Sequence, residues 1–488
     1  MTIEPESQGP GNRPPLALGV IAIVGIVVGT LIALGPRAPE PQPEGPPASA
    51  VAPEVVAEEP RVAPAWTQSV SPAEFSRCKL LDPRPDSVKA LYRGQQRDGV
   101  IGRDNVGFPR TEREIPGLGE GNIIVAKVAF DDAPPSEAIP DTYLEDQMAI
   151  LTQWSEFFSQ GKFRYTFQVV EGWVEVPVNH ADYPIDPGVG DNLYDQEEFQ
   201  KQMDGRMETI AKLVVAELPE DLDYASAHAM FVYWTPEITA FKQSVSYRQG
   251  RFQTPQGAQT IPFSGGGLYH VRDSGSLPFE TKRDFLWTWW AHDIMHFQGM
   301  NGHAPGNGWK TGLGQGAYPL AGEFSGVLTA WETFLFEWLD DEQVFCADLD
   351  TLTQPQQIML TPLEIYGGER KMIAIRTVDH KVLVVESRRP VGYSESWDPL
   401  NSGLLVYEVD ADGVHTDHVP NDSGNCPSAP KWAYYLYPDH VANKGCAEND
   451  IDNVVVREGD TLTHSGVKIS LEFSDEELDY VQVERVSE

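Results

Sequence analysis

Two histidines four residues apart are the strongest chemical signal in this sequence. They belong to the run His292-Asp293-Ile294-Met295-His296. On a helix, side chains at positions i and i+4 project from one face, so both imidazoles can reach one zinc ion. Asp293 holds the position at which an H-E-x-x-H metallopeptidase carries the glutamate that acts as general base. We therefore take His292 and His296 as candidate zinc ligands and Asp293 as the candidate catalytic residue.

The motif departs from the extended pattern H-E-x-x-H-x-x-G-x-x-H in two ways. Aspartate is one methylene shorter than glutamate, and a catalytic group misplaced by about 1 Å can cost about a hundredfold in rate. Gly299 holds the glycine position, where the helix must turn sharply, but Gly302 stands at the third-ligand position and has no side chain to bind metal. His303 comes one residue later. Because a loop can shift by one residue, we take His303 as the candidate third ligand.

A structural role for the same histidines stays open. Two histidines at this spacing also occur by chance. The helix expected over residues 281–297 is rich in tryptophan (Trp287, Trp289 and Trp290), and there His292 and His296 could be core residues with satisfied hydrogen bonds.

The segments that must position this helix alternate between strand and helix patterns. Before it we expect a strand over 122–130, a helix over 142–159, a hairpin of two short strands turning at Gly172, a strand over 227–234 and a turn at Gly265-Gly266-Gly267. After residue 357, strand-length apolar runs dominate. This order predicts an α+β domain followed by a β-rich C-terminal part.

In their shared order, these segments resemble the immune inhibitor A family of secreted bacterial zinc metallopeptidases, along nearly all of residues 120–488. The pieces that carry the resemblance are Phe130-Asp131-Asp132 at the end of the first strand, the segment FFSQGKFRYTFQVVEGWVEVP (157–177), Leu328-Thr329-Ala330-Trp331, Phe336-Glu337-Trp338-Leu339 and the later runs IMLTPL, VLVVESRR and GLLVYEVD. The resemblance implies a metzincin-like zinc-peptidase domain, which we place at 75–345, a β-rich C-terminal domain at 346–488, and a protein or peptide substrate.

Departures from the family pattern cluster at the candidate zinc site. The family has glutamate in place of Asp293, an aspartate ligand in place of Gly302, and a methionine-containing turn where residues 316–321 have no methionine. Two hypotheses therefore stay open. The chain is either an active zinc peptidase that uses a metal-activated water, or a peptidase-fold protein that has lost catalysis and serves as a binding or structural module at the cell surface.

The N-terminal part of the chain predicts a membrane anchor. Residues 16–34 are apolar and uncharged, and as a helix they would span roughly 28 Å, about the thickness of the hydrocarbon core. Signal-peptide cores are shorter, and Gly35-Pro36 makes a poor cleavage site. We prefer an uncleaved signal anchor behind a cytoplasmic tail, 1–15, to a cleaved signal peptide. Residues 36–65, rich in Pro, Ala and Glu, are expected to be a disordered spacer. The chain would then be a single-pass cell-membrane protein with its C-terminal domain extracytoplasmic.

Charge and cysteines limit the partners. The net charge of -37, from 73 acidic and 36 basic residues, repels phosphates and argues against nucleic acid as a partner.

No cysteine lies in a C-x-x-C pair, which argues against a thiolate zinc site. Outside the cytoplasm, four cysteines are compatible with two disulfides. Cys426 with Cys446 is the favoured pair because they bracket a short segment, and Cys78 with Cys346 would follow by elimination.

Acidic turns are weaker candidates for metal binding. Asp410 with Asp412-Gly413, and residues 449–452, carry oxygen ligands that could bind calcium. Neither stretch matches a complete calcium loop, and acidic turns with glycine are usually only turns.

Overall fold

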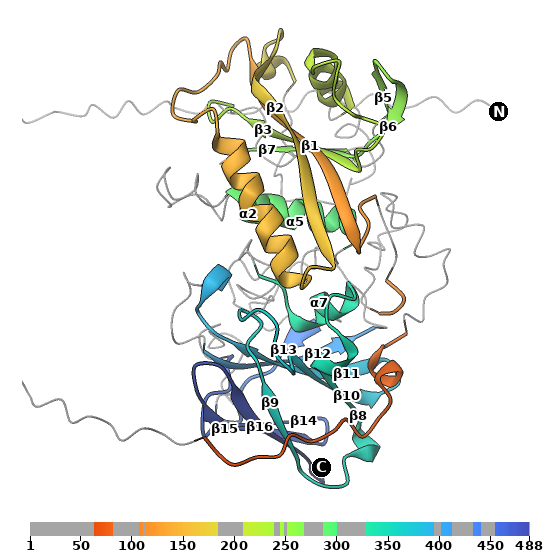
Figure 1. Ribbon diagram of the computed structural model, residues 1–488, viewed down its shortest axis with the longest axis vertical. Helices are drawn as coiled ribbons and strands as arrows, with labels where there is room; N and C mark the ends of the chain where they lie inside the picture. The colour runs from red at the N-terminus through yellow and green to blue at the C-terminus, as the bar shows by residue number, and fades with distance from the viewer. Residues whose placement is uncertain are drawn as a thin grey trace, which may run out of the picture. The chain divides into compact units, whose positions relative to one another are not determined.

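The structure is a computed structural model (Figure 1). It describes residues 63–81, 107–110, 114–183, 208–238, 245–247, 251–267, 286–299, 327–394, 402–411, 433–440 and 454–487. These residues lie in one compact unit, Val62–Glu488. No helix within these ranges is long and apolar enough to cross a membrane, and the apolar segment 16–34 lies outside them.

The first sheet is mostly parallel and has the strand order β2-β1-β3-β7-β4. Only β4 runs antiparallel to its neighbour, β7. The long apolar run of β1 is buried on both faces, as expected for a central parallel strand covered on both sides. The strands are β1 (Gly119–Phe130), β2 (Phe163–Val176), β3 (Ala229–Trp234), β4 (Val245–Tyr247) and β7 (Phe263–Gly266).

Each face of this sheet packs against different elements. Ile123 and Val125 of β1 share a core with α2 (Tyr143–Phe158) and α5 (Leu286–Gln298), and Figure 1 shows α2 running beside β1 and β2. The alternate residues of β1 face a second core, formed with a helix over 208–217 and the hairpin of β5 (Arg251–Thr254) and β6 (Gly257–Thr260). The helix predicted over 142–159 is confirmed as α2.

The hairpin expected at Gly172 is wrong. β2 is one strand that pairs with β1 on both sides of Gly172, with a register shift between Val125 and Lys127 of β1. Gly172 has φ +71°, in the left-handed region that favours glycine. The glycine therefore forms a bulge, and the chain continues along the same partner because both halves of β2 bury side chains against β1 and its neighbours.

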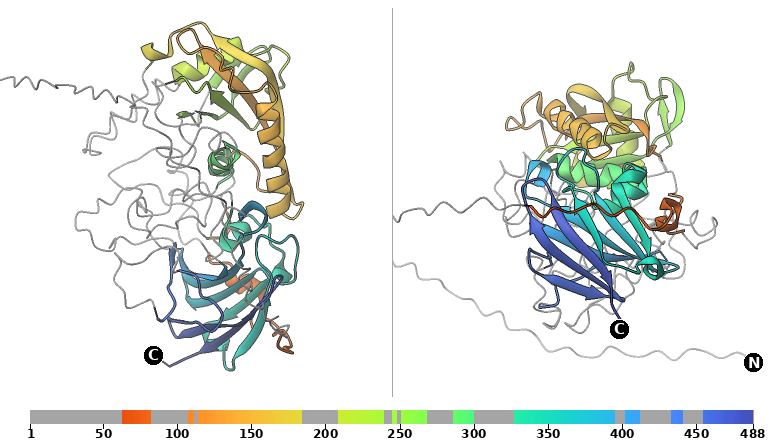
Figure 2. Two further views of the ribbon diagram at one scale, coloured as in Figure 1. Left: turned by 90° about the vertical axis from the view of Figure 1, so that its left-hand side faces the viewer. Right: turned by 60° about the horizontal axis from the view of Figure 1, so that its bottom comes forward.

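The C-terminal part consists of two further sheets, as its apolar runs predict. Their orders are β13-β12-β11-β10-β8 and β14-β15-β16-β9, and they stack face to face around one apolar core (Figure 2). The strands are β8 (Val344–Asp348), β9 (Gln356–Leu360), β10 (Met372–Val378), β11 (Lys381–Arg388), β12 (Gly403–Asp410), β13 (Ala433–Tyr435), β14 (Thr461–His464), β15 (Val467–Ser474) and β16 (Asp479–Arg485).

Two features connect the first sheet to this sandwich. The outer face of the β8-containing sheet joins the core of α2 and α5 through α7 (Ala330–Leu335). The expected division at 345/346 falls inside β8, which pairs with β10. A disulfide joins Cys78 to Cys346, with their Cα atoms 5.7 Å apart, which confirms that predicted pair. Cys426 and Cys446 lie outside the described residues.

Candidate metal centre

The helix that carries the histidine motif ends where the sequence predicts. α5 covers Leu286–Gln298, and Gly299 follows with φ +103°, a conformation that glycine adopts at helix ends without strain. The last residue of α5 is held by the core, because the Tyr165 hydroxyl donates to Gln298 Oε1 at 2.7 Å and Gln298 Nε2 donates to the Pro116 carbonyl at 2.7 Å. The C-terminal end of the motif helix is therefore fixed in place.

The glycine-rich stretch before this helix is not the expected turn. Gly265 and Gly266 lie within β7. A Cβ atom on Gly266 would lie 2.0 Å from the ring of Trp289, and one on Gly265 would lie 2.1 Å from the ring of Trp234. Both positions therefore need glycine because large aromatic rings occupy the space beside the strand. This lets α5 lie close to β7 and places Ser264 against the helix.

The described part of the motif is buried at this junction. His292 is 1% exposed and Asp293 is 7% exposed. The hydroxyl of Ser264 donates a hydrogen bond to Asp293 Oδ2 at 2.9 Å, so the carboxylate is oriented by β7. His296 lies one helical turn after His292 within α5. The side chain of His296 and the whole of His303 lie outside what the structure describes.

The donor set on α5 fits zinc in residue type and spacing. Catalytic zinc sites in proteins commonly use two imidazoles one helical turn apart with a carboxylate beside the first, which is the order of residue types in this helix. Within the described ranges, no group of three or more His, Cys, Asp or Glu side chains is arranged to hold a metal ion.

The acidic turn at Asp410 has a lysine beside it. Its carboxylate lies 3.6 Å from Lys381 Nζ. A positive side chain at this distance opposes a bound cation. Asp412-Gly413 and residues 449–452 lie outside the described residues.

Sequence analysis missed a buried charged network between α7 and β11. Arg388 is fully buried and pairs with Glu386 at 2.8 Å and with Glu364 at 2.9 Å. Glu386 Oε2 also accepts from the Ala330 backbone N–H at 2.6 Å and from the Tyr407 hydroxyl at 2.8 Å. The available signal was the run VLVVESRR, in which charged residues interrupt an otherwise apolar strand.

The same region holds a carboxyl group with a strongly shifted pKa. Glu332 is 1% exposed and closes a capping box at the start of α7, where its Oε2 accepts from the Thr329 backbone N–H at 2.8 Å. Burial raises the pKa of Glu332 to about 7, against the opposing effect of the Thr329 hydrogen bonds. Burial also raises the pKa of Glu386, although Arg388 opposes the shift. Glu386 of β11 accepts from the first backbone N–H of α7 and so holds this helix on the sheet, while Glu332 caps the start of the same helix.

The comparisons with known proteins leave the function to be argued from the chain's own residues. No protein-family model and no curated protein matches the chain. Solved structures of OgpA from Akkermansia muciniphila align at 14% identity and a TM-score of 0.23, covering 64% of this chain and 90% of that one. A complex of catalytically inactive OgpA with an O-glycopeptide substrate aligns at 14% identity and a TM-score of 0.22, covering 65% of this chain and 91% of that one. These alignments show a distant likeness to OgpA.

Proposed function

We propose that this chain is a membrane-anchored zinc metallopeptidase whose active site lies outside the cytoplasm. The observation that carries the proposal is the junction of α5 and β7. There a helix presents His292 with His296 one turn later, and Asp293 is buried beside them and oriented by Ser264. The resemblance in segment order to secreted metallopeptidases and the apolar segment 16–34 support the substrate class and the location.

Each residue has a distinct role in this proposal. His292 and His296 would hold zinc through ring nitrogens, and His303 would complete the protein ligands. A bound zinc ion would lower the pKa of a water molecule and polarise the scissile carbonyl. Asp293 would accept the proton of the attacking water and pass it to the leaving amine. The Ser264 hydroxyl would fix the direction of the Asp293 carboxylate.

One observation favours the alternative, a binding or structural module without catalysis. Ser264 already donates to Oδ2 of Asp293, and only 7% of this residue is exposed. One oxygen of the carboxylate is therefore already occupied by a donor, and little of the side chain is open to an attacking water. With a side chain one methylene shorter than glutamate, Asp293 would also be less well placed to take a proton from that water.

Metal content and peptide cleavage together test the proposal. Full-length protein, purified in detergent without chelator, should contain about one zinc ion per chain. His292→Ala and His296→Ala should each lose the metal and any cleavage of a broad peptide library. The matched control is His440→Ala, which removes a 58% exposed histidine on the C-terminal sandwich and should keep the metal. No zinc in the unaltered chain, and none taken up on addition, would defeat the metal site.

Replacing Asp293 with the longer glutamate distinguishes the peptidase from the binding module. Asp293→Glu restores the usual reach and should raise the rate of cleavage by up to about a hundredfold. Stoichiometric zinc with no cleavage, even in Asp293→Glu, would favour the binding module over the peptidase.

The location is tested separately. The full chain should fractionate with membranes, and a chain that starts near Ala65 should be soluble, because the apolar segment 16–34 is the proposed anchor. A mature N-terminus near Pro36 or Val51 would contradict the uncleaved anchor.

A further inference from the structure

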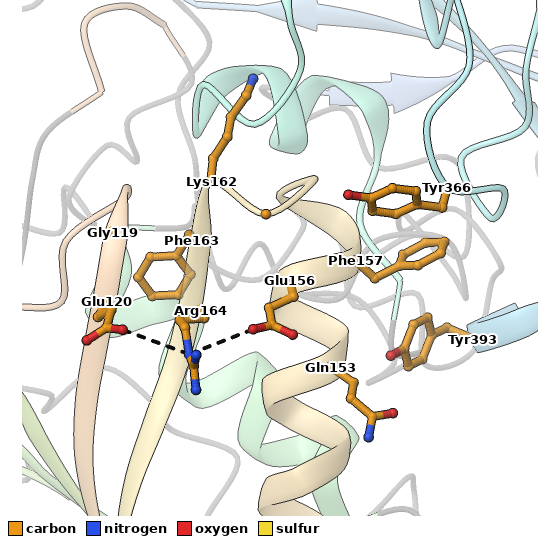
Figure 3. A pocket seen from close by; sticks show the side chains of 11 residues that line it. Gly119, Glu120, Gln153, Glu156, Phe157, Lys162, Phe163, Arg164, Tyr366 and Tyr393 are labelled. Atoms are coloured by element: carbon orange, nitrogen blue, oxygen red, sulfur yellow. Dashed lines mark ion pairs between the residues drawn. The ribbon is translucent and has the colours of Figure 1, made fainter.

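A hollow of about 700 Å³ lies on the surface away from the histidine motif. Figure 3 shows the rings of Phe157, Tyr366 and Tyr393 on one side, and Glu120, Arg164 and the ring of Phe163 on the other. Its lining comes from β1, α2, β2 and the turns that carry Tyr366 and Tyr393. None of the described lining residues belongs to α5, although Tyr393 of the lining packs on Trp287 of that helix, with ring centroids 5.8 Å apart.

The aromatic side is a continuous strip. The ring centroid of Phe157 lies 5.8 Å from that of Tyr366 and 5.4 Å from that of Tyr393. Rings this close touch one another, so they form a wall and leave no space between them for a cation, as an aromatic cage would need. Tyr366 is 61% exposed, an uncommon exposure for a large ring that serves only packing. The strip therefore offers an apolar surface to a flat ligand.

The polar side consists of planar groups that stay in contact with water. Arg164 Nε lies 3.7 Å from Glu156 Oε1 and 4.0 Å from Glu120 Oε1, and all three side chains are at least 44% exposed. Ion pairs this exposed and this long contribute little to stability, so their oxygens and N–H groups can exchange water for ligand hydroxyls. Gln153, also exposed, adds an amide donor and acceptor to the lining.

We propose that this hollow binds a neutral pyranose of an oligosaccharide. A pyranose has flat faces of C–H groups that pack on aromatic rings, and a rim of hydroxyls that both donate and accept. The strip of Phe157, Tyr366 and Tyr393 suits the C–H face, while Gln153, Glu156 and Arg164 suit the rim. The volume falls within the range of small-molecule sites. An anionic sugar is disfavoured because Glu120 and Glu156 flank the guanidinium of Arg164, and the other cation of the lining, Lys162, is paired with Asp340 at 2.8 Å.

Titration of the full-length chain tests this site. The protein is purified in lauryldimethylamine oxide, because a glycoside detergent would compete, and is titrated calorimetrically with cellotetraose, maltotetraose and chitotetraose. At least one neutral oligosaccharide should bind with a Kd of about 1 mM or tighter. Tetragalacturonate, which is anionic, and a proline decapeptide, which also packs on aromatic strips, should bind more weakly than that oligosaccharide.

Variants place the binding in the hollow. Tyr366→Ala should weaken it about tenfold or more without loss of folding, because that ring is 61% exposed. Trp66→Ala is the matched control, since this partly exposed ring packs on Tyr480 outside the hollow and its loss should leave the affinity unchanged. His292→Ala should also leave it unchanged. The proposal is overturned if no neutral oligosaccharide binds, if Tyr366→Ala has no effect, or if tetragalacturonate or the decapeptide binds best.

Discussion

Two helices of the same core, α5 and α7, each bury a carboxyl group, yet the two groups have different hydrogen-bond partners. Asp293 on α5 is 7% exposed and Glu332 on α7 is 1% exposed. Glu332 is turned back on its own helix, where it caps the first turn through Thr329. Asp293 is instead held by a residue of another element, Ser264 of β7. The α7 carboxylate completes a helix end, and the α5 carboxylate stands beside two histidines.

The difference teaches that a shifted pKa can belong to a structural carboxylate, as it does on α7. Ionisable groups with perturbed pKa values often mark functional sites. Here the pKa of Glu332, raised to about 7, and the raised pKa of Glu386 belong to a network that binds backbone groups and Arg388. The type and spacing of the donors on α5, and not the size of a pKa shift, distinguish a candidate site from a structural support.

The largest change in the free energy of unfolding is expected from a variant that breaks the buried network beside α7. Arg388→Ala leaves Glu386 and Glu364 buried without their cation, and removing one partner of a buried pair typically costs about 3–5 kcal/mol. The free energy of unfolding, measured by urea denaturation, should fall by this amount. The folded protein should still bind zinc if α5 and α7 serve separate roles.

An exposed arginine provides the control for this variant. Arg485 pairs with Asp350 at 3.2 Å, and both side chains are well exposed, so Arg485→Ala should change the free energy of unfolding by less than about 1 kcal/mol. Equal effects of the two variants would contradict a supporting role for the buried network.

The second effect is a pH dependence specific to Glu332. Its folded pKa of about 7 lies above the ordinary value of 4.5. Between these two pH values the unfolded chain loses a proton that the folded chain keeps, so the free energy of unfolding falls as pH rises through this window. Two and a half pKa units correspond to at most about 3 kcal/mol. Glu332→Gln removes this fall, because glutamine does not ionise.

The difference in unfolding free energy between the unaltered chain and Glu332→Gln isolates the contribution of Glu332. Neighbouring Glu386 and Arg388 titrate or stay charged in both chains, so subtracting the unfolding free energies leaves mainly the contribution of Glu332. The advantage of Glu332→Gln should grow from pH 4.5 to pH 7 and then stay level. An advantage that is constant with pH would show that Glu332 has an ordinary pKa.

Local patterns in the sequence predicted the elements that hold the motif. The apolar run of 122–130 became β1, and the helical spacing of Leu144, Met148 and Leu151 became the buried face of α2. Gly299 was expected to end the motif helix and does so with φ +103°. These predictions succeeded because periodicity and the conformational freedom of glycine act over a few residues and are visible in one chain segment.

Predictions that depended on distant neighbours failed. The sequence predicts turns at Gly172 and Gly265, because glycine in isolation indicates a turn. Gly172 is instead a bulge, because β2 keeps the same partner strand on either side of it. Gly265 lies within β7, where the ring of Trp234 occupies the space that a side chain would need. The partners of Arg388 lie 2 and 24 positions earlier, at Glu386 and Glu364. The spacing of Glu386 and Arg388 places both on one face of a strand, but no local pattern indicates that Glu364 joins them.

The smallest effect comes from removing one hydroxyl that binds the buried carboxylate of each helix. Ser264→Ala deletes the donor to Asp293, and Thr329→Val deletes the hydroxyl that lies 3.0 Å from Glu332 Oε2 and 3.2 Å from its backbone N–H. A hydrogen bond to a charged group contributes about 1.5–3 kcal/mol and a helix cap about 1 kcal/mol, so both variants should lower the free energy of unfolding by roughly 1–2 kcal/mol. Only Ser264→Ala should change the zinc affinity or the pH profile of peptide cleavage, because only Asp293 stands beside the histidines. If Thr329→Val altered the metal site equally, or if Ser264→Ala altered stability alone, the distinction between a catalytic and a supporting helix would fail.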